Sequence, residues 1–175
     1  MQHKPDYHGQ MTDDFTDRLL EKWESARPDI GVGALQVTAR LARIGPLLAR
    51  RQEAVFDRFG LSRGEVGMLS SLRTAGPPHR LSPTRLGQGL MLSSAGVTSR
   101  LDRLERRGFV MRLPDPDDRR GVIVELTDAG LEIVDAAVEA NTANDRQLMD
   151  RFDAQELETL EALLRKLLGG LESPA

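Results

Sequence analysis

Serines and arginines gather on one face of a stretch that is predicted to be a helix from residue 94 to residue 107. At about 100° per residue, this face lies opposite the apolar side of the helix. Small residues let a helix backbone approach base edges, and arginine donates paired hydrogen bonds to guanine or phosphate. We therefore expect Ala95, Ser99, Arg103 and Arg106 on this face, together with Ser94 at the start of the helix, to meet a DNA major groove. The alternative is an ordinary amphipathic surface helix with solvated charges.

A segment rich in aspartate and arginine, PDPDDRRG, follows this helix. β-Branched residues flank it at 110–113 and 122–126, so the pattern predicts a hairpin with this segment at its tip. Carboxylates repel phosphates, but the arrangement suits DNA if Asp118 holds Arg120 in a fixed orientation for a narrow minor groove, with Arg119 on a phosphate. The alternative is a polar turn with a surface ion pair, which would contribute less than about 1 kcal/mol.

Helices must position this face and this hairpin. Val97, Leu101 and Leu104 recur at helical spacing and predict the side that anchors helix 94–107 to a core. Capping residues, glycines and prolines divide the rest of the chain into further helices. These are predicted at about 12–25, 34–59, 61–74, 83–90 and 127–150, and from 153 to near the C-terminus.

The chain has 175 residues and a net charge of −3, but its charges are unevenly distributed. Residues 60–121 carry eleven basic and six acidic side chains, whereas residues 127–175 carry four basic and eleven acidic ones. The basic charge therefore lies in the same part of the chain as the DNA-binding pattern.

Other kinds of chemistry find little support in the residues. The chain has no cysteine, and its three histidines, His3, His8 and His79, are scattered, so we expect no disulfide and no metal site. No nucleophile elbow or phosphate-binding loop occurs, so we expect no enzyme and no cofactor. No apolar run approaches the length of a membrane span and no signal core occurs, so we expect a cytoplasmic protein.

The segment LSSAGVTSRLDRLERRGFVMRLPDPDDRRGVIVELTDAG resembles the winged helix-turn-helix core of the MarR family of bacterial transcription regulators. The resemblance extends from about Leu61 to Gly130 and includes the helix end RLERRGFV, the tip DPDDRR and the helix start LTDAG. It implies that Asp118 and Arg120 form an Asp-x-Arg wing motif with Arg120 in the minor groove. It also implies an obligate homodimer on a pseudo-palindromic operator, with half-sites about ten base pairs apart.

The fold class implied by this resemblance is mainly α, with a winged helix-turn-helix domain of three core helices and a β-hairpin wing. That domain would span 61–126, and dimerisation helices would lie at 34–60 and 127–175. An N-terminal tail and an extra helix would occupy 1–33. The chain departs from the family at Gly87 and Gly89, in a helix that is usually rich in alanine and glutamate.

The extra helix and its tryptophan, Trp23, make the chain similar to the urate-responsive branch of that family. The similarity includes Arg100, on the flank of helix 94–107, and Arg112, on the first wing strand. It implies a small anionic or aromatic effector held by these three residues. An aspartate that this branch uses is replaced here by Val66, so the resemblance does not name urate. The alternative is that Trp23 lies in the dimer core and both arginines bind phosphates or carboxylates.

The sequence therefore predicts a ligand-responsive transcription regulator, most simply a repressor, that binds double-stranded DNA as a homodimer. An activator is an open alternative, because nothing in the residues separates the two. A winged-helix module that docks a protein partner without sequence-selective DNA binding is another, although it leaves the arginine-bearing tip unexplained.

Overall fold

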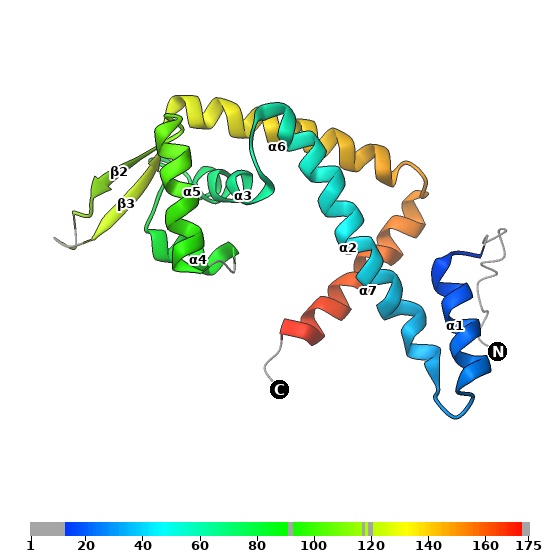
Figure 1. Cartoon of the computed structure of the whole chain (residues 1–175). Coiled ribbons are helices and arrows are strands. Elements are labelled where there is room, and N and C mark those ends of the chain that lie inside the picture. The colour runs from blue at the N-terminus through cyan, green and yellow to red at the C-terminus, as the bar shows by residue number, and fades with distance from the viewer. Residues whose placement is uncertain (1–12, 91–92, 117, 119–120, 173–175) are drawn as a thin grey trace. The chain divides into compact units, whose positions relative to one another are not determined.

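The computed structural model describes residues 13–90, 93–116, 118 and 121–172. Helices predominate, and the chain divides into two compact units, residues 1–50 and 51–175. The predicted helices and the two wing strands are confirmed within a few residues at each end (Figure 1). The elements are α1 (Phe15–Ala26), η1 (Val32–Ala34), α2 (Leu35–Phe56), η2 (Asp57–Phe59), α3 (Arg63–Thr74), β1 (Arg80–Leu81), α4 (Pro83–Leu90), α5 (Ser94–Arg106), β2 (Val110–Pro114), β3 (Val122–Leu126), α6 (Asp128–Met149) and α7 (Ala154–Glu172).

The first unit pairs α1 with the N-terminal part of α2. Asp14 is the N-cap of α1, where its Oδ1 accepts hydrogen bonds from the backbone N–H groups of Thr16 at 2.6 Å and Asp17 at 3.1 Å. Arg40 of α2 bridges back to both carboxylates, at 2.8 Å to Asp14 and 2.6 Å to Asp17. Leu20 of α1 is buried. The cap and the ion pairs together fix the start of α1 against α2.

The second unit has a continuous hydrophobic core. Its members come from the end of α2, the turn before α3, the helices α3, α4 and α5, the strands β2 and β3, and the first half of α6, and most are less than 5% exposed. Burial of so many aliphatic side chains supplies the main favourable term in folding. The core residues are Val55, Phe56, Leu61, Val66, Met68, Leu69, Leu72, Leu86, Val97, Leu101, Leu104, Val110, Val124, Leu126, Val134 and Ala137.

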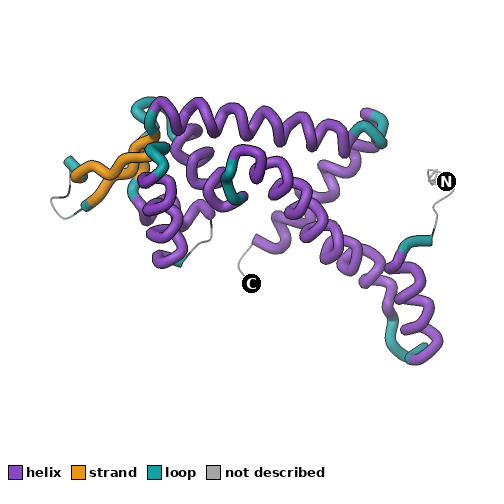
Figure 2. The backbone as a smooth tube through the Cα atoms, turned by 45° about the horizontal axis from the view of Figure 1, so that its top comes forward, coloured by secondary structure: helices purple, strands orange, loops and turns teal. Residues whose placement is uncertain are grey.

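A small antiparallel sheet, whose strands are orange in Figure 2, forms the wing, and its strand order is β1-β3-β2. The register runs from Val110 opposite Leu126 to Pro114 opposite Val122. The sequence did not predict β1, because two residues are too few to show an alternating pattern. Arg80 of β1 lies opposite Glu125 of β3 and its Nε donates to that carboxylate at 2.5 Å. The strand β1 thus supports the base of the predicted hairpin formed by β2 and β3.

Helix α6 begins in close contact with the turn between α5 and β2. Its N-cap, Thr127, accepts a hydrogen bond from the Gly130 N–H at 3.0 Å and donates its own backbone N–H to the Phe109 carbonyl at 3.1 Å. A Cβ atom on Gly130 would lie 2.0 Å from that same carbonyl oxygen. Glycine is therefore required at this point for the two segments to meet.

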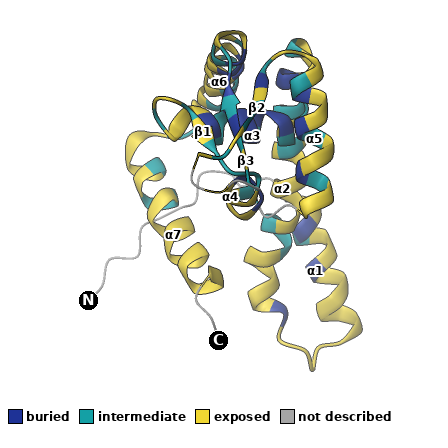
Figure 3. Cartoon of the chain, turned by 90° about the vertical axis from the view of Figure 1, so that its left-hand side faces the viewer, coloured by how far each residue is buried: buried dark blue, intermediate teal, exposed yellow. Residues whose placement is uncertain are grey.

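Helix α7 is exposed along its whole second half (Figure 3). Five of its leucines are between 37% and 76% exposed: Leu163, Leu164, Leu167, Leu168 and Leu171. An exposed stripe of this size is typical of an interaction surface. None of the helices in the described ranges is long and apolar enough to cross a membrane.

Gly89, which departs from the family pattern, lies in open space in α4. No heavy atom of the described residues falls within 4 Å of a Cβ built there. Gly89→Ala is therefore expected to raise the free energy of unfolding by about 0.5–1 kcal/mol, because alanine loses less backbone entropy in a helix. Urea unfolding at fixed protein concentration measures this. A lower unfolding midpoint than the parent's would show that the glycine is needed for packing.

Candidate nucleic-acid interface

The predicted DNA-reading face lies on α5, which three buried side chains fix to the second unit. Val97, Leu101 and Leu104 are at most 3% exposed. The N-cap Ser93 accepts a hydrogen bond at Oγ from the Gly96 N–H at 3.2 Å. This anchoring leaves the opposite face of the helix to solvent.

The opposite face of α5 is exposed, as the sequence predicts. Ala95, Ser99 and Arg106 on this face have exposed side chains, and so does Ser94 at the start of the helix. The Nε of Arg106 donates to the backbone carbonyl of Asp102 at 3.2 Å, which directs the guanidinium along the helix surface. A turn of small residues followed by cations is a surface that can enter a groove of DNA.

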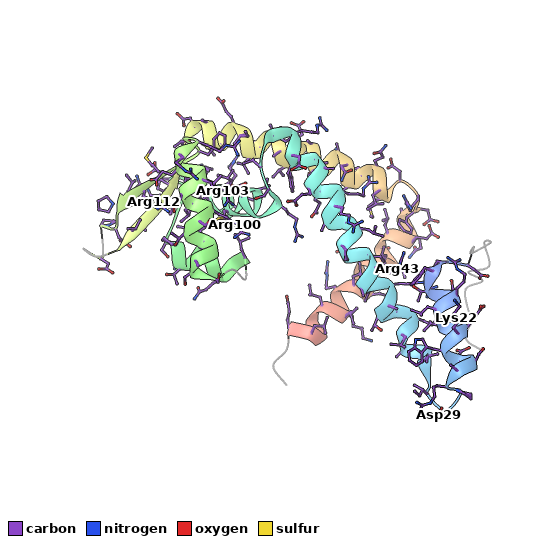
Figure 4. The ribbon with its side chains drawn as sticks, viewed as in Figure 1. Lys22, Asp29, Arg43, Arg100, Arg103 and Arg112 are labelled. Carbon is purple, nitrogen blue, oxygen red and sulfur yellow. The ribbon has the colours of Figure 1, made fainter. Side chains whose placement is uncertain are left out.

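Arg103 is held by a buried carboxylate from α3 (Figure 4). Its Nε donates to Oε1 of Glu65 at 2.9 Å, and its Nη1 donates to Oγ of Ser99 at 3.2 Å. The Arg103 side chain is 43% exposed, whereas that of Glu65 is 6% exposed. The structure thus brings two predicted contacts, Ser99 and Arg103, together and adds Glu65 as their support.

Glu65 stays ionised despite its burial. Desolvation raises the pKa of the carboxyl, but hydrogen bonds from the Ser62 N–H, the Arg103 guanidinium and the Ser62 hydroxyl outweigh it, so the pKa of Glu65 lies below its ordinary value of 4.5. A lowered pKa means that the folded state binds its proton less tightly than the unfolded chain does. The stabilisation from Glu65 is therefore complete above the ordinary pKa and is lost as pH falls through the lowered one.

Glu65→Gln is expected to remove this acid-sensitive stabilisation. At pH 7 the variant should unfold at lower urea concentration than the parent, and the gap should close as pH falls from the ordinary pKa of 4.5 through the lowered pKa of Glu65. Parallel urea titrations between pH 7 and pH 3 measure the gap. A gap that stays constant over this range would mean that the charge on Glu65 does not stabilise the fold.

Backbone hydrogen bonds join the described residues at the two ends of the wing tip. The Asp115 N–H donates to the Gly121 carbonyl at 3.1 Å, and the Gly121 N–H donates to the Asp118 carbonyl at 2.8 Å. Asp118 is exposed. Arg119 and Arg120 lie outside the described residues, so their predicted contacts remain predictions. The strands nevertheless end where the tip begins, at the pair Pro114–Val122.

Arg112 of β2 forms ion pairs with two carboxylates of α5. Its Nη2 lies 2.6 Å from Oδ1 of Asp102, its Nη1 lies 2.5 Å from Oε2 of Glu105, and its backbone N–H donates to Oε1 of Glu105 at 3.2 Å. Asp102 and Glu105 are about 200° and 140° around α5 from Arg100. Arg112 therefore contacts the face of α5 opposite Arg100, and the structure does not bring the two arginines together as expected.

Arg100 lines a hollow of about 680 Å³ between α2, α3, α4 and α5. Its Nη1 donates to the Gly96 carbonyl at 3.0 Å. Its Nε is buried and has no hydrogen-bond partner among the described residues. Gly64 admits the guanidinium, because a Cβ there would lie 2.6 Å from that Nε. Arg63 and Glu53 are the other charged groups in the lining, which therefore carries one net positive charge.

Trp23 lies in the first unit, on α1. It is 47% exposed and continues a stripe with Phe15 and Leu19, at spacings of four residues. Residues at this spacing share one face of a helix. The predicted grouping of Trp23 with Arg100 remains a prediction.

Two supporting residues were missed in the sequence. The pattern Ser62-x-x-Glu65 could have predicted a capping box at the start of α3, which the structure has. Arg107 donates to the carbonyls of Gly60 at 2.6 Å and Phe59 at 3.3 Å, which ties the end of α5 to the turn before α3. The contact of Glu65 with Arg103 and the contacts of Arg107 with the turn before α3 leave no signal in the spacing of residues along the chain.

Comparisons with known proteins agree with this geometry. Residues 61–122 match the MarR family. The HTH-type transcriptional regulator PecS of Dickeya dadantii (strain 3937) is 36% identical over 149 residues, which are 85% of this chain and 90% of PecS.

Solved structures show the same fold. Sco5413, a MarR family transcriptional regulator from Streptomyces coelicolor, aligns with a TM-score of 0.69 and 30% identity over 81% of this chain and 96% of that one. A point mutant of MarR from E. coli, complexed with operator DNA, aligns with a TM-score of 0.65 and 28% identity over 83% of this chain and 97% of that one. The match of residues 61–122 to the MarR family and the similarity to PecS along most of both chains show that the protein belongs to the MarR family.

Proposed function

We propose that this protein is a ligand-responsive transcription regulator, a repressor, that binds a pseudo-palindromic operator in double-stranded DNA as a homodimer. The observation that carries the proposal is the exposed face of α5, which is anchored by three buried residues and followed by a wing. A relative named as a transcriptional regulator and a structural neighbour bound to operator DNA support it. The proposal includes no catalytic role, and it places the action in the cytoplasm, where bacterial DNA lies.

The proposed contacts fall into two sets. Side chains on α5 meet the major groove: Ser94, Ala95, Ser99, Arg103 and Arg106. On the wing, Arg120 enters the minor groove, Asp118 orients it and Arg119 contacts a phosphate. The first set supplies base readout, and the second adds recognition of groove width.

Salt dependence tests the placement of α5. Arg106→Ala is expected to weaken operator binding and to reduce the slope of log affinity against log salt by about 1, because one positive charge is removed from the DNA interface. Arg146→Ala, at an exposed arginine near the end of α6, is the matched control and should keep the parent slope. Equal slopes for the parent and both variants would refute the placement of Arg106 on the DNA.

The second copy in the proposed homodimer covers the leucine stripe of α7. Those five leucines are exposed in the single chain, and apolar stripes of this kind are covered in stable dimers. Sedimentation equilibrium at micromolar concentration should give twice the 19.4 kDa mass of the chain. A monomer mass for the folded protein would contradict the proposal.

We further propose that the effector is a small anion that binds in the hollow beside Arg100. The Nε of Arg100, which has no partner among the residues that the structure describes, and the net positive lining support this, and the volume lies within the range of small-molecule sites. A buried donor without a partner carries a desolvation cost that an anionic acceptor removes.

Benzoate, a small aromatic anion, serves as the probe. Calorimetric titration should show binding to the parent and at least about tenfold weaker binding to Arg100→Gln, because a charge-assisted hydrogen bond is lost. Arg146→Gln is the control and should bind benzoate like the parent. Unchanged binding by Arg100→Gln would refute the site. Trp23 is the sole tryptophan, so quenching of its fluorescence by benzoate tests separately whether it contacts the ligand.

A further inference from the structure

Glu65 is the one charged side chain that is buried in the part of the chain that the structure describes, at 5% exposure. Removing a carboxylate from water is costly unless hydrogen bonds and an opposite charge compensate for it. Both compensations are present. Oε2 accepts from the Ser62 N–H and hydroxyl, each at 2.9 Å, and Oε1 accepts from Nε of Arg103 at 2.9 Å.

Helix capping alone does not explain this arrangement. Glu156 makes the same kind of cap at the start of α7, with the Asp153 N–H donating to its Oε2 at 3.0 Å, and it does so at an exposed position. Capping by Glu65 uses Oε2, which leaves Oε1 free to bind α5. Unlike Glu156, the buried Glu65 therefore also binds an arginine of another helix, Arg103, which lies 38 positions further along the chain.

The link fixes an arginine at the edge of the exposed face of α5. Arg103 donates one hydrogen bond to Glu65 and another to Ser99, while 43% of its side-chain surface remains exposed to solvent. A free arginine loses rotamer entropy when it binds a base, whereas a guanidinium held in place beforehand does not. Because the Glu65 side chain is only 6% exposed, its charge is shielded from a phosphate backbone.

We propose that Glu65 is a positioning residue for DNA recognition, which holds the guanidinium of Arg103 in the orientation that reads a base edge. This inference rests on the proposed function, in which the exposed face of α5 meets the major groove. It assigns to α3 a part in sequence selectivity, although the Glu65 side chain itself does not reach the DNA.

Glu65→Gln separates positioning from capping. Glutamine at this position supports the capping box, so α3 keeps its start. With its carbonyl oxygen on Ser62, the amide NH2 faces the Arg103 Nε–H, and two donors do not bond. On the duplex selected by the parent protein, we expect about tenfold weaker binding, the loss of one oriented base contact. Affinity for random duplex and the salt slope should stay at parent values, because the charge of Arg103 remains.

Ser62→Ala is the matched control. It weakens the same helix cap but leaves Oε1 of Glu65 on Arg103, so it should lower the unfolding midpoint and keep operator affinity within about twofold of the parent. A purely structural role for Glu65 predicts the opposite pattern, in which both variants lose affinity in proportion to their loss of stability.

A double-mutant cycle with Arg103→Ala decides the matter. If Glu65 acts through Arg103, Glu65→Gln has no further effect on operator affinity once Arg103 is alanine. An equal loss in both backgrounds, or tighter binding by Glu65→Gln alone, would overturn the positioning role while leaving the proposed function intact. If Arg103→Ala itself binds operator like the parent, the proposed contact of Arg103 fails, and the role of Glu65 fails with it.

Discussion

Replacing Gly130 by alanine is expected to lower the free energy of unfolding by about 3 kcal/mol, the upper part of the range for overpacked sites. The added Cβ would lie 2.0 Å from the Phe109 carbonyl oxygen and 2.8 Å from Cδ1 of Leu126. The Phe109 carbonyl cannot move aside cheaply, because it accepts the backbone hydrogen bond from Thr127 that starts α6. The substitution therefore forces apart α6 and the turn that leads from α5 into the wing.

Urea unfolding monitored by circular dichroism measures this loss, with parent and variant at one protein concentration because dimerisation adds to apparent stability. Gly89→Ala is the matched control, since it makes the same chemical change where no described atom lies within 4 Å. We expect the free energy of unfolding to fall in Gly130→Ala and to rise in Gly89→Ala. A Gly130→Ala protein as stable as the parent would show that α6 does not pack this closely on the turn.

Arg120→Ala is expected to weaken operator binding about 100-fold, a loss near the upper end for one specific arginine contact. The wing resembles that of the MarR family, in which this arginine enters the minor groove. In the described part of the wing, β2 and β3 pair as far as Pro114 and Val122. A narrow minor groove has enhanced negative potential, which attracts a guanidinium.

Fluorescence anisotropy on the duplex selected by the parent measures this effect. Arg120→Lys is the control, because it keeps the charge and removes the planar fork. Its affinity should fall between those of the parent and the alanine variant. If Arg120→Ala bound the duplex as tightly as the parent, the wing would have no place in the minor groove.

The sequence predicts most of the helices and the hairpin because their signals are local. Caps, glycines and apolar spacing mark the ends and faces of α3, α4 and α5, and each element lies within a few residues of its expected bounds. The strand β1 has no such signal, because its two residues form a strand only by pairing with β3. The same is true of Gly130, whose importance comes from a carbonyl that belongs to a different segment.

The sequence predicts which side chains of α5 are exposed, because this depends on one helix. It does not predict which residues of other elements contact them, because this depends on how the elements pack. Periodicity places Ser99 and Arg103 on the exposed side of α5, and the structure agrees. Periodicity also places Arg100 on the flank, but the partners of Arg100 and Arg112 depend on how α3 and β2 pack on α5. Glu65 was missed in the sequence, although the pattern Ser62-x-x-Glu65 could have predicted its capping role, whereas its pairing with Arg103 follows from tertiary packing alone.

In vitro selection of random duplex DNA by the purified protein, at near-physiological salt, tests whether the protein reads base sequence as a dimer. Non-specific binding is salt-sensitive and carries no sequence information, so enrichment at this salt reports base readout. We expect a pseudo-palindrome with half-sites about one helical turn apart, which matches two copies of α5 related by a twofold axis. A folded, dimeric protein that enriches no sequence would contradict this expectation, and would favour a winged-helix module that binds a protein partner.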